Sequence, residues 1–78
     1  MYYVYILRLQ NGNYYTGSTT DLKKRLQNHF QNSVQTTKNN KTEEVAFYAA
    51  FRSLDKARAF ERYLKSSSGF AFRNQRLI

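Results

Sequence analysis

The sequence predicts an α+β fold, in which a small β-sheet, antiparallel at least in one hairpin, is covered by helices. Three observations predict it. The chain holds three aromatic and β-branched runs that are typical of strands, and a turn signal separates the first two. Two segments repeat apolar residues at helical spacing after helix-capping residues, and a third short helix follows. The order strand, strand, helix, strand, helix, helix contains neither repeat nor linker, so residues 1–78 are expected to be one domain.

The first two strands are predicted to form a β-hairpin. Tyr2–Leu9 is rich in aromatic and β-branched residues and ends at the turn signal Gln10-Asn11-Gly12. A second strand-like run, Asn13–Ser18, follows at once. Because the intervening segment is so short, the two runs are expected to pair as neighbours.

The length of the hairpin loop decides which side chains share a face of the sheet. A two-residue Asn-Gly loop would put Tyr5 and Tyr15 on opposite faces. A three-residue loop has a type I turn followed by a left-handed Gly12 in a bulge. It would place Tyr15 opposite Leu7 and therefore on the same face as Tyr5. The local sequence leaves both registers open.

A first helix is predicted over Leu22–Phe30, because the preceding Thr19-Thr20-Asp21 cluster offers N-caps. Its expected apolar stripe consists of Leu22, Leu26 and Phe30. The opposite face carries Lys23, Lys24, Gln27 and Asn28. Arg25 and His29 are four residues apart, so they lie together along one margin of the stripe.

The second half of the chain is predicted to hold a loop, a strand and a helix. Gln31–Glu44 is polar and without periodicity, which indicates a long loop. Val45–Phe51 is the third strand, and Ser53 caps a second helix over Leu54–Lys65. The apolar face of that helix holds Leu54, Ala57, Phe60 and Leu64. Glu61 falls in the middle of this face.

The last segment is predicted to be a short third helix. Ser66-Ser67-Ser68-Gly69 is expected to break the second helix. Phe70–Ile78 then places Phe70, Asn74 and Leu77 on one face.

Glu61 is the residue that departs most from the apolar pattern. A carboxylate on an apolar face must be paired, neutralised or bound to a metal, since burying it alone is too costly. An ion pair is the ordinary explanation, and a lone residue such as His29 is ordinarily packed and hydrogen-bonded. Together, however, one carboxylate, one arginine, one histidine and two strand tyrosines supply what metal-assisted phosphodiester hydrolysis requires.

Composition limits the possible partners and sites. The chain has no cysteine and one histidine, which excludes disulfides, a thiolate zinc site and a histidine metal cage. Thirteen Lys and Arg against five Asp and Glu give a net charge of +8, which favours nucleic acid as a partner over a merely solubilising surface. The basic residues are scattered, which argues against a membrane-surface helix. No apolar run approaches the ~20 residues of a membrane span, so we expect a soluble intracellular protein without a membrane partner.

The chain resembles the GIY-YIG nuclease superfamily, most closely its small single-domain bacterial members. Val4-Tyr5-Ile6 and Tyr15-Thr16-Gly17 correspond to the two signatures, with Val in place of Gly and Thr in place of Ile, and their tyrosines are ten residues apart. The similarity continues through Leu22-Lys23-Lys24-Arg25-Leu26 with His29, and through Phe60-Glu61-Arg62-Tyr63-Leu64-Lys65. It covers essentially the whole chain.

The resemblance implies a three-stranded antiparallel sheet flanked by about three helices, and phosphodiester cleavage with one divalent metal ion, Mg²⁺ or Mn²⁺. Tyr5 matches the tyrosine that helps to deprotonate the attacking water, and Tyr15 matches the second tyrosine, at the water or phosphate. Arg25 matches the arginine that stabilises the phosphate, and His29 matches a histidine that is a proton-transfer partner. Glu61 matches the residue that ligates the metal. Asn74 matches, more loosely, an asparagine near the end of the domain.

These matches also favour the three-residue hairpin loop, because both tyrosines must point at one phosphate. We therefore expect an endonuclease of the bacterial cytoplasm that acts on DNA rather than RNA, with structure-guided or low sequence specificity and a possible role in repair or recombination. The expected nucleic-acid-binding residues are Lys23, Lys24, Arg25 and Lys65. The alternative is a catalytically silent nucleic-acid-binding module of the same fold.

Overall fold

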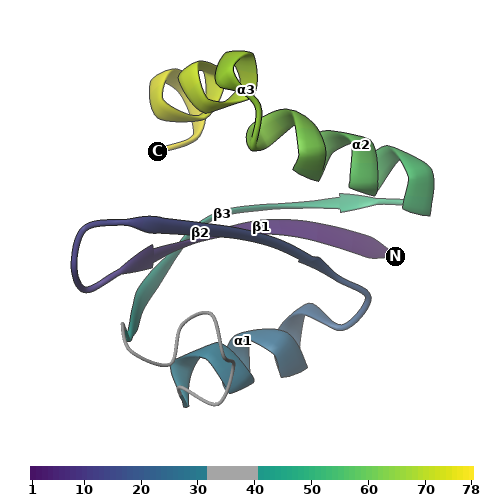
Figure 1. Ribbon diagram of the computed structural model, residues 1–78. Helices are drawn as coiled ribbons and strands as arrows, with labels where there is room; N and C mark the ends of the chain where they lie inside the picture. The colour runs from purple at the N-terminus through teal and green to yellow at the C-terminus, as the bar shows by residue number, and fades with distance from the viewer. Residues whose placement is uncertain (32–40) are drawn as a thin grey trace.

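The computed structural model, which describes residues 1–31 and 41–78, is an α+β fold in three layers (Figure 1). Its strands are β1 (Tyr2–Leu9), β2 (Tyr14–Thr19) and β3 (Thr42–Phe51), and its helices are α1 (Leu22–Phe30), α2 (Leu54–Leu64), α3 (Ser67–Phe72) and the π-helical segment η2 (Arg73–Leu77). The strands form one antiparallel sheet in the order β2-β1-β3. Helix α1 covers one face, and α2 with α3 covers the other (Figure 1). The predicted fold class and element order are confirmed.

The central strand β1 is buried on both faces of the sheet, which explains its nearly continuous apolar sequence. Val4 and Ile6 pack against Ala57 and Leu64 of α2. The alternate residues of β1, Tyr5, Leu7 and Leu9, form the second core on the side of α1. A polar side chain on β1 that faces α1 is therefore held among packed neighbours and has a fixed position.

The hairpin has the three-residue loop. Leu9 N donates to Asn13 O at 2.8 Å, and Gly12 N donates to Leu9 O at 3.0 Å, which closes a turn. Gly12 has φ +88°, a left-handed conformation that favours glycine. Leu7 pairs with Tyr15, and Tyr5 pairs with Gly17. The expected register is confirmed, and both signature tyrosines lie on the α1 face.

Helix α1 has the predicted bounds, but its buried face differs from the prediction at one position. The Asp21 side chain accepts a hydrogen bond from Lys24 N and caps the helix. The predicted apolar stripe is wrong at its last position, because Phe30 is 48% exposed while His29 is fully buried. The imidazole of His29 packs against the rings of Tyr5 and Tyr15 beneath the helix. The buried stripe therefore continues at His29, seven residues after Leu22, rather than at Phe30, eight residues after it.

Strand β3 begins earlier than predicted. It starts at Thr42 instead of Val45, so the last three residues of the predicted loop belong to the strand, and two of them, Thr42 and Glu44, pair with β1. Two register irregularities, after Ile6 and after Arg8, accommodate the extra residues of β3. Residues 32–40 of the predicted loop lie outside the described part of the chain. The early start was hidden because two exposed glutamates occupy this end of the strand and pair with Arg8.

The third helix also begins earlier than predicted. Ser66 caps α3, accepting from Gly69 N at 3.2 Å, so the predicted break over residues 66–69 is the start of the helix. Gly69 is required there, because a Cβ would overlap the carbonyl oxygen of Tyr63. Of the residues predicted to share one face, Leu77 packs against the core, whereas Phe70 is 52% exposed and Asn74 is exposed. Gly69 and Arg73 are buried. In residues 1–31 and 41–78, no helix is long and apolar enough to cross a membrane.

Candidate active site

Tyr5 reaches the edge of the sheet by passing over a glycine of the neighbouring strand. Its backbone lies in the central strand and its side chain is buried. A Cβ built on Gly17 would lie 2.6 Å from the Tyr5 hydroxyl and 2.8 Å from Cζ. Only a residue without a side chain therefore lets the phenol of Tyr5 cross β2 at this point.

Three rings meet around the Tyr5 hydroxyl. The Tyr5 Oη and His29 Nε2 share a hydrogen bond of 3.0 Å. Tyr15, half-buried on β2, completes the cluster, with its ring centroid 6.3 Å from that of Tyr5 and 5.2 Å from that of His29. Two strands and α1 thus hold one imidazole and two phenols in mutual contact, and each ring limits the movement of the others.

The electrostatics of this cluster are set by burial and by Arg25, one helical turn before His29. Burial and the neighbouring Tyr15 raise the pKa of Tyr5 to about 12, although the Arg25 guanidinium acts in the opposite direction. Burial, assisted by the Arg25 charge, lowers the pKa of His29 below its ordinary value. At neutral pH the pair is therefore a protonated phenol beside a neutral imidazole, an arrangement in which the imidazole can accept a proton.

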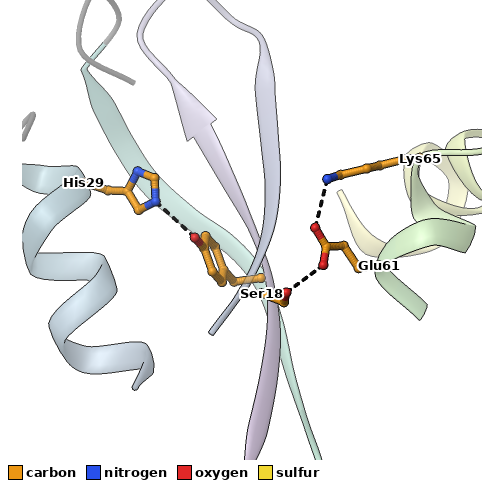
Figure 2. A network of polar contacts seen from close by, with 5 residues as sticks. Ser18, His29, Glu61 and Lys65 are labelled. Carbon is orange, nitrogen blue, oxygen red and sulfur yellow. Dashed lines mark hydrogen bonds and ion pairs between the residues drawn. The ribbon is translucent and has the colours of Figure 1, made fainter. Parts of the chain in front are cut away.

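Glu61 lies on α2, on the other side of β2, in a network of its own (Figure 2). Ser18 Oγ donates to Glu61 Oε1 at 2.6 Å, and Lys65 Nζ donates to Oε2 at 2.8 Å. Burial alone would raise the pKa of Glu61, but the hydrogen bonds from Lys65 and Ser18 and the charges of Lys65 and Arg58 outweigh it, so the pKa is lowered. Glu61 is therefore an ionised carboxylate at neutral pH.

The two parts of the site act on each other electrostatically. The negative charge of Glu61 contributes to the raised pKa of Tyr5, so the carboxylate lies within electrostatic range of the phenol. In Figure 2, Ser18 lies between Glu61 and His29, which approach from α2 and α1. The edge of β2 thus lies between the Tyr5–His29 pair, which can accept a proton, and the Glu61 carboxylate, whose oxygens can bind a cation.

The remaining candidate residues are placed as follows. Lys23 and Lys24 are exposed on α1, and Lys24 lines an open groove with Arg25 and Asn28. Lys65 is engaged with Glu61. Asn74 accepts two hydrogen bonds from Arg73, and in the described part of the chain it makes no contact with the residues of the site.

Comparison with known proteins identifies the family. A family model described as the GIY-YIG catalytic domain matches residues 1–75. The chain belongs to the GIY-YIG family. Its family is thus one of nucleases, which act on nucleic acid and generally depend on a divalent metal. A search of curated proteins found no match.

A solved structure supports the same relationship. A UPF0213 protein from Bacillus halodurans, determined by NMR in solution, is 28% identical in sequence and superposes with a TM-score of 0.60. The alignment covers 99% of this chain and 87% of that protein. The two proteins therefore share the fold over nearly their entire lengths.

The carboxylate of this GIY-YIG chain is chemically suited to a divalent ion. Magnesium is commonly bound through one or two carboxylates, and water and substrate phosphates complete its coordination. Glu61 is ionised, and its Oε2 already holds a cation, the Lys65 ammonium. Over residues 1–31 and 41–78, no group of three or more His, Cys, Asp or Glu could form a closed metal site. The donor set therefore fits an open site with one protein ligand.

Sequence reasoning missed the structural roles of two residues of this candidate site. Gly17 was recognised as part of a signature, but its role as the passage for Tyr5 depends on strand pairing. Ser18 orients Glu61 from 43 residues away in the sequence, and no local pattern marks such a contact. By contrast, the i, i+4 spacing of Glu61 and Lys65 could have indicated their ion pair.

Proposed function

We propose that this protein is a divalent-metal-dependent endonuclease that hydrolyses phosphodiester bonds in DNA. The observation that carries the proposal is the Tyr5–His29 hydrogen bond at a glycine passage, within electrostatic range of the ionised Glu61. A protein that only binds nucleic acid has no need of a buried phenol bonded to a neutral imidazole. Family membership supports the reaction class.

The proposed reaction begins with a proton relay. A phenol with a pKa of about 12 is a poor base by itself. The neutral His29 can take the Tyr5 proton through their 3.0 Å hydrogen bond while the phenol oxygen takes a proton from the attacking water. The phenol is thus protonated before and after the step, and the charge appears on the imidazole. Tyr15 holds both rings in position.

The phosphate is the second charge to be stabilised. Arg25, next to the Tyr5 hydroxyl, would neutralise charge that grows on the phosphate oxygens. Glu61 would hold the metal ion, with Ser18 orienting the carboxylate; when bound, Mg²⁺ or Mn²⁺ supplies Lewis-acid stabilisation of the phosphate and the leaving oxygen.

The substrate is expected to be held mainly through phosphate contacts, with structure-guided or low sequence specificity. The sequence-based candidates for these contacts are Lys23, Lys24, Arg25 and Lys65. The proposed substrate is DNA rather than RNA. The proposed compartment is the bacterial cytoplasm, and the proposed role is in repair or recombination.

Glu61→Gln tests the proposal. The amide keeps an oxygen that can accept from Ser18, and the lost ion pair to Lys65 is partly exposed, so stability should change by less than about 1 kcal/mol. Cleavage should fall by several orders of magnitude, while DNA binding stays equal or becomes slightly tighter. Single-turnover cleavage with Mg²⁺ or Mn²⁺, binding and thermal unfolding are measured on one preparation.

Asp55→Asn is the matched control, because it removes the same charge from the exposed first turn of α2. It should leave cleavage unchanged. A Glu61→Gln protein that cleaves at the wild-type rate would refute the role of Glu61.

One observation favours the alternative of a silent nucleic-acid-binding module. The Lys65 ammonium already neutralises Glu61 at 2.8 Å, as an ion pair in a purely binding protein would. In that case the wild type and Glu61→Gln would bind DNA equally and neither would cleave single-stranded, duplex, flap or branched substrates with either metal. Metal-dependent cleavage that Glu61→Gln abolishes excludes this alternative.

A further inference from the structure

Arg73 is a buried charged side chain outside the candidate active site. It is only 9% exposed. Its guanidinium lies between two aromatic rings, 4.4 Å from the centroid of Phe70 on α3 and 5.1 Å from that of Tyr14 on β2. This stacking fixes the guanidinium plane and joins the C-terminal helices to the start of β2.

No carboxylate compensates this charge. Arg73 Nε and Nη2 donate to Asn74 Oδ1 at 3.1 and 2.9 Å, and Asn74 is neutral. All five acidic residues lie in the described part of the chain, and none of them forms an ion pair with Arg73. Glu43 and Glu44 pair with Arg8, Glu61 pairs with Lys65, Asp21 caps α1, and Asp55 lies in the first turn of α2. A desolvated charge without a counter-ion is costly even where aromatic rings and an amide oxygen contact it, which indicates that its counter-charge comes from outside the chain.

The guanidinium opens into a groove. Gly12, Asn13, Tyr14, Phe70 and Arg73 line an open groove of about 430 Å³ where the hairpin meets α3. Nη1 makes no hydrogen bond to any of the described residues, so it can donate to a ligand in this groove. The lining contains one positive charge, an amide, a phenol and no carboxylate, a chemistry that suits a phosphate oxygen.

The groove lies on the same side of β2 as Glu61. Tyr14 and Ser18 point to the same face because they are four residues apart in one strand, and Ser18 contacts Glu61. The two positions are roughly 13 Å apart along the strand. One nucleic-acid strand can therefore pass both of them if its backbone follows the edge of β2.

We propose that Arg73 is an anchor for a second backbone phosphate of the nucleic acid, a few nucleotides from the phosphate at Tyr5 and Glu61. The inference rests on the proposed function for the identity of the polymer. Tyr14 and Phe70 position the guanidinium, Asn74 holds one of its edges, and the free edge donates to the phosphate. A single small domain thereby holds its substrate at two points and fixes the direction of the strand across the site.

The test measures binding of a fluorescent DNA duplex by anisotropy over a series of salt concentrations, with Glu61→Gln in every protein so that the DNA stays intact. Adding Arg73→Gln should weaken binding by about tenfold or more. The slope of log affinity against log salt should become shallower by about 0.9, the value for one phosphate contact. The matched control is Arg52→Gln, which removes the same charge just beyond Phe51, a residue paired with Tyr2 at the end of β1 away from the hairpin turn. Its slope should not change.

A measurement on the intact arginine guards against misfolding of the variant. In the Glu61→Gln protein, the Nε–H resonance of Arg73, assigned by its loss in Arg73→Lys, should shift when the duplex is added. An unchanged slope in folded Arg73→Gln, or an unmoved resonance in a protein that binds DNA, would show that Arg73 only clamps the helices and would overturn this inference alone. A Glu61→Gln protein with no affinity for DNA would overturn the proposed function together with it.

Discussion

Gly17 determines where the phenol of Tyr5 can lie. A Cβ at this position would approach Tyr5 Oη to 2.6 Å and Tyr15 Cε2 to 3.0 Å, and both rings are packed. We expect Gly17→Ala to displace the phenol, break its hydrogen bond to His29, lower cleavage by more than tenfold and destabilise the fold by about 1–3 kcal/mol. Single-turnover kinetics and thermal unfolding measure the two effects.

A double-mutant cycle with Tyr5→Phe identifies the clash. Phenylalanine lacks the hydroxyl oxygen that lies closest to the new methyl group, so Gly17→Ala should cost less stability in the Tyr5→Phe background than in the wild type. Equal costs in the two backgrounds would mean that Gly17 matters for another reason.

His29 should make both cleavage and stability depend on pH. Burial and Arg25 lower its pKa in the folded protein, whereas in the unfolded chain it titrates near 6.5. The unfolded state therefore binds the proton more readily, so the stabilisation is complete above about pH 6.5 and is lost as the pH falls through the folded pKa. Cleavage should fall on the acid side with an apparent pKa below 6.5, because the relay needs a neutral imidazole.

His29→Gln provides the comparison, since its amide can still bond to the Tyr5 hydroxyl but does not titrate. Melting temperatures measured between roughly pH 5 and 8 should vary less in this variant than in the wild type. The lowered pKa of Glu61 keeps its own titration below 4.5 and so outside this window. Identical pH profiles of stability in the two proteins would contradict the assigned protonation state of His29.

At the scale of the elements, the sequence predicted what local rules determine. Alternation, caps and turn residues identified all three strands, α1 and α2, and Asp21 and Ser53 cap these helices as expected. Local rules could not predict the hairpin register, because the local sequence was compatible with both a two-residue and a three-residue loop. The prediction of the three-residue loop followed from the family resemblance, which implies that Tyr5 and Tyr15 face one phosphate.

What remained hidden depends on partners distant in sequence. His29 is buried instead of Phe30 because the Tyr5 and Tyr15 rings lie beneath that position of α1. Arg73 is buried because Tyr14, 59 residues earlier, supplies one of the rings around it. A helical wheel contains neither partner, so it placed Phe30 on the apolar stripe and gave no sign that Arg73 is buried.

The hairpin loop offers a test of the register. Gly12 has φ +88° and no atom within 4 Å of an added Cβ, so Gly12→Ala should cost only backbone strain, about 1–2 kcal/mol, and leave cleavage intact. Deleting Asn13 instead keeps the three-residue loop but pairs Leu9 with Tyr14. This shifts the register by one residue and turns Tyr15 to the opposite face. The deletion should abolish cleavage even in the fraction that circular dichroism shows to be folded. A deletion variant that cleaves would contradict the need for both tyrosines on one face.

At the scale of the whole molecule, positive charge is in large excess, and three of the five acidic side chains already form ion pairs. Thirteen Lys and Arg face five Asp and Glu, and Arg8 and Lys65 take three of the five as ion-pair partners. Among residues 1–31 and 41–78, most Lys and Arg side chains are therefore exposed and form no ion pair with another described residue. Such a surface attracts a polyanion over a long range, and the attraction weakens with salt.

Lys23 and Lys24 test whether this charge contacts phosphates or acts only through its sum. Both are exposed on α1, and Lys24 shares a groove with Arg25. If each contacts one phosphate, Lys23→Ala and Lys24→Ala should each weaken duplex binding for all sequences alike and make the slope of log affinity against log salt shallower by about 0.9. Lys56→Ala, which removes the same charge from the exposed first turn of α2, should leave the slope unchanged. Equal slopes in all three variants would mean that α1 attracts DNA only through net charge, and an affinity independent of salt would remove the basis for a nucleic-acid partner.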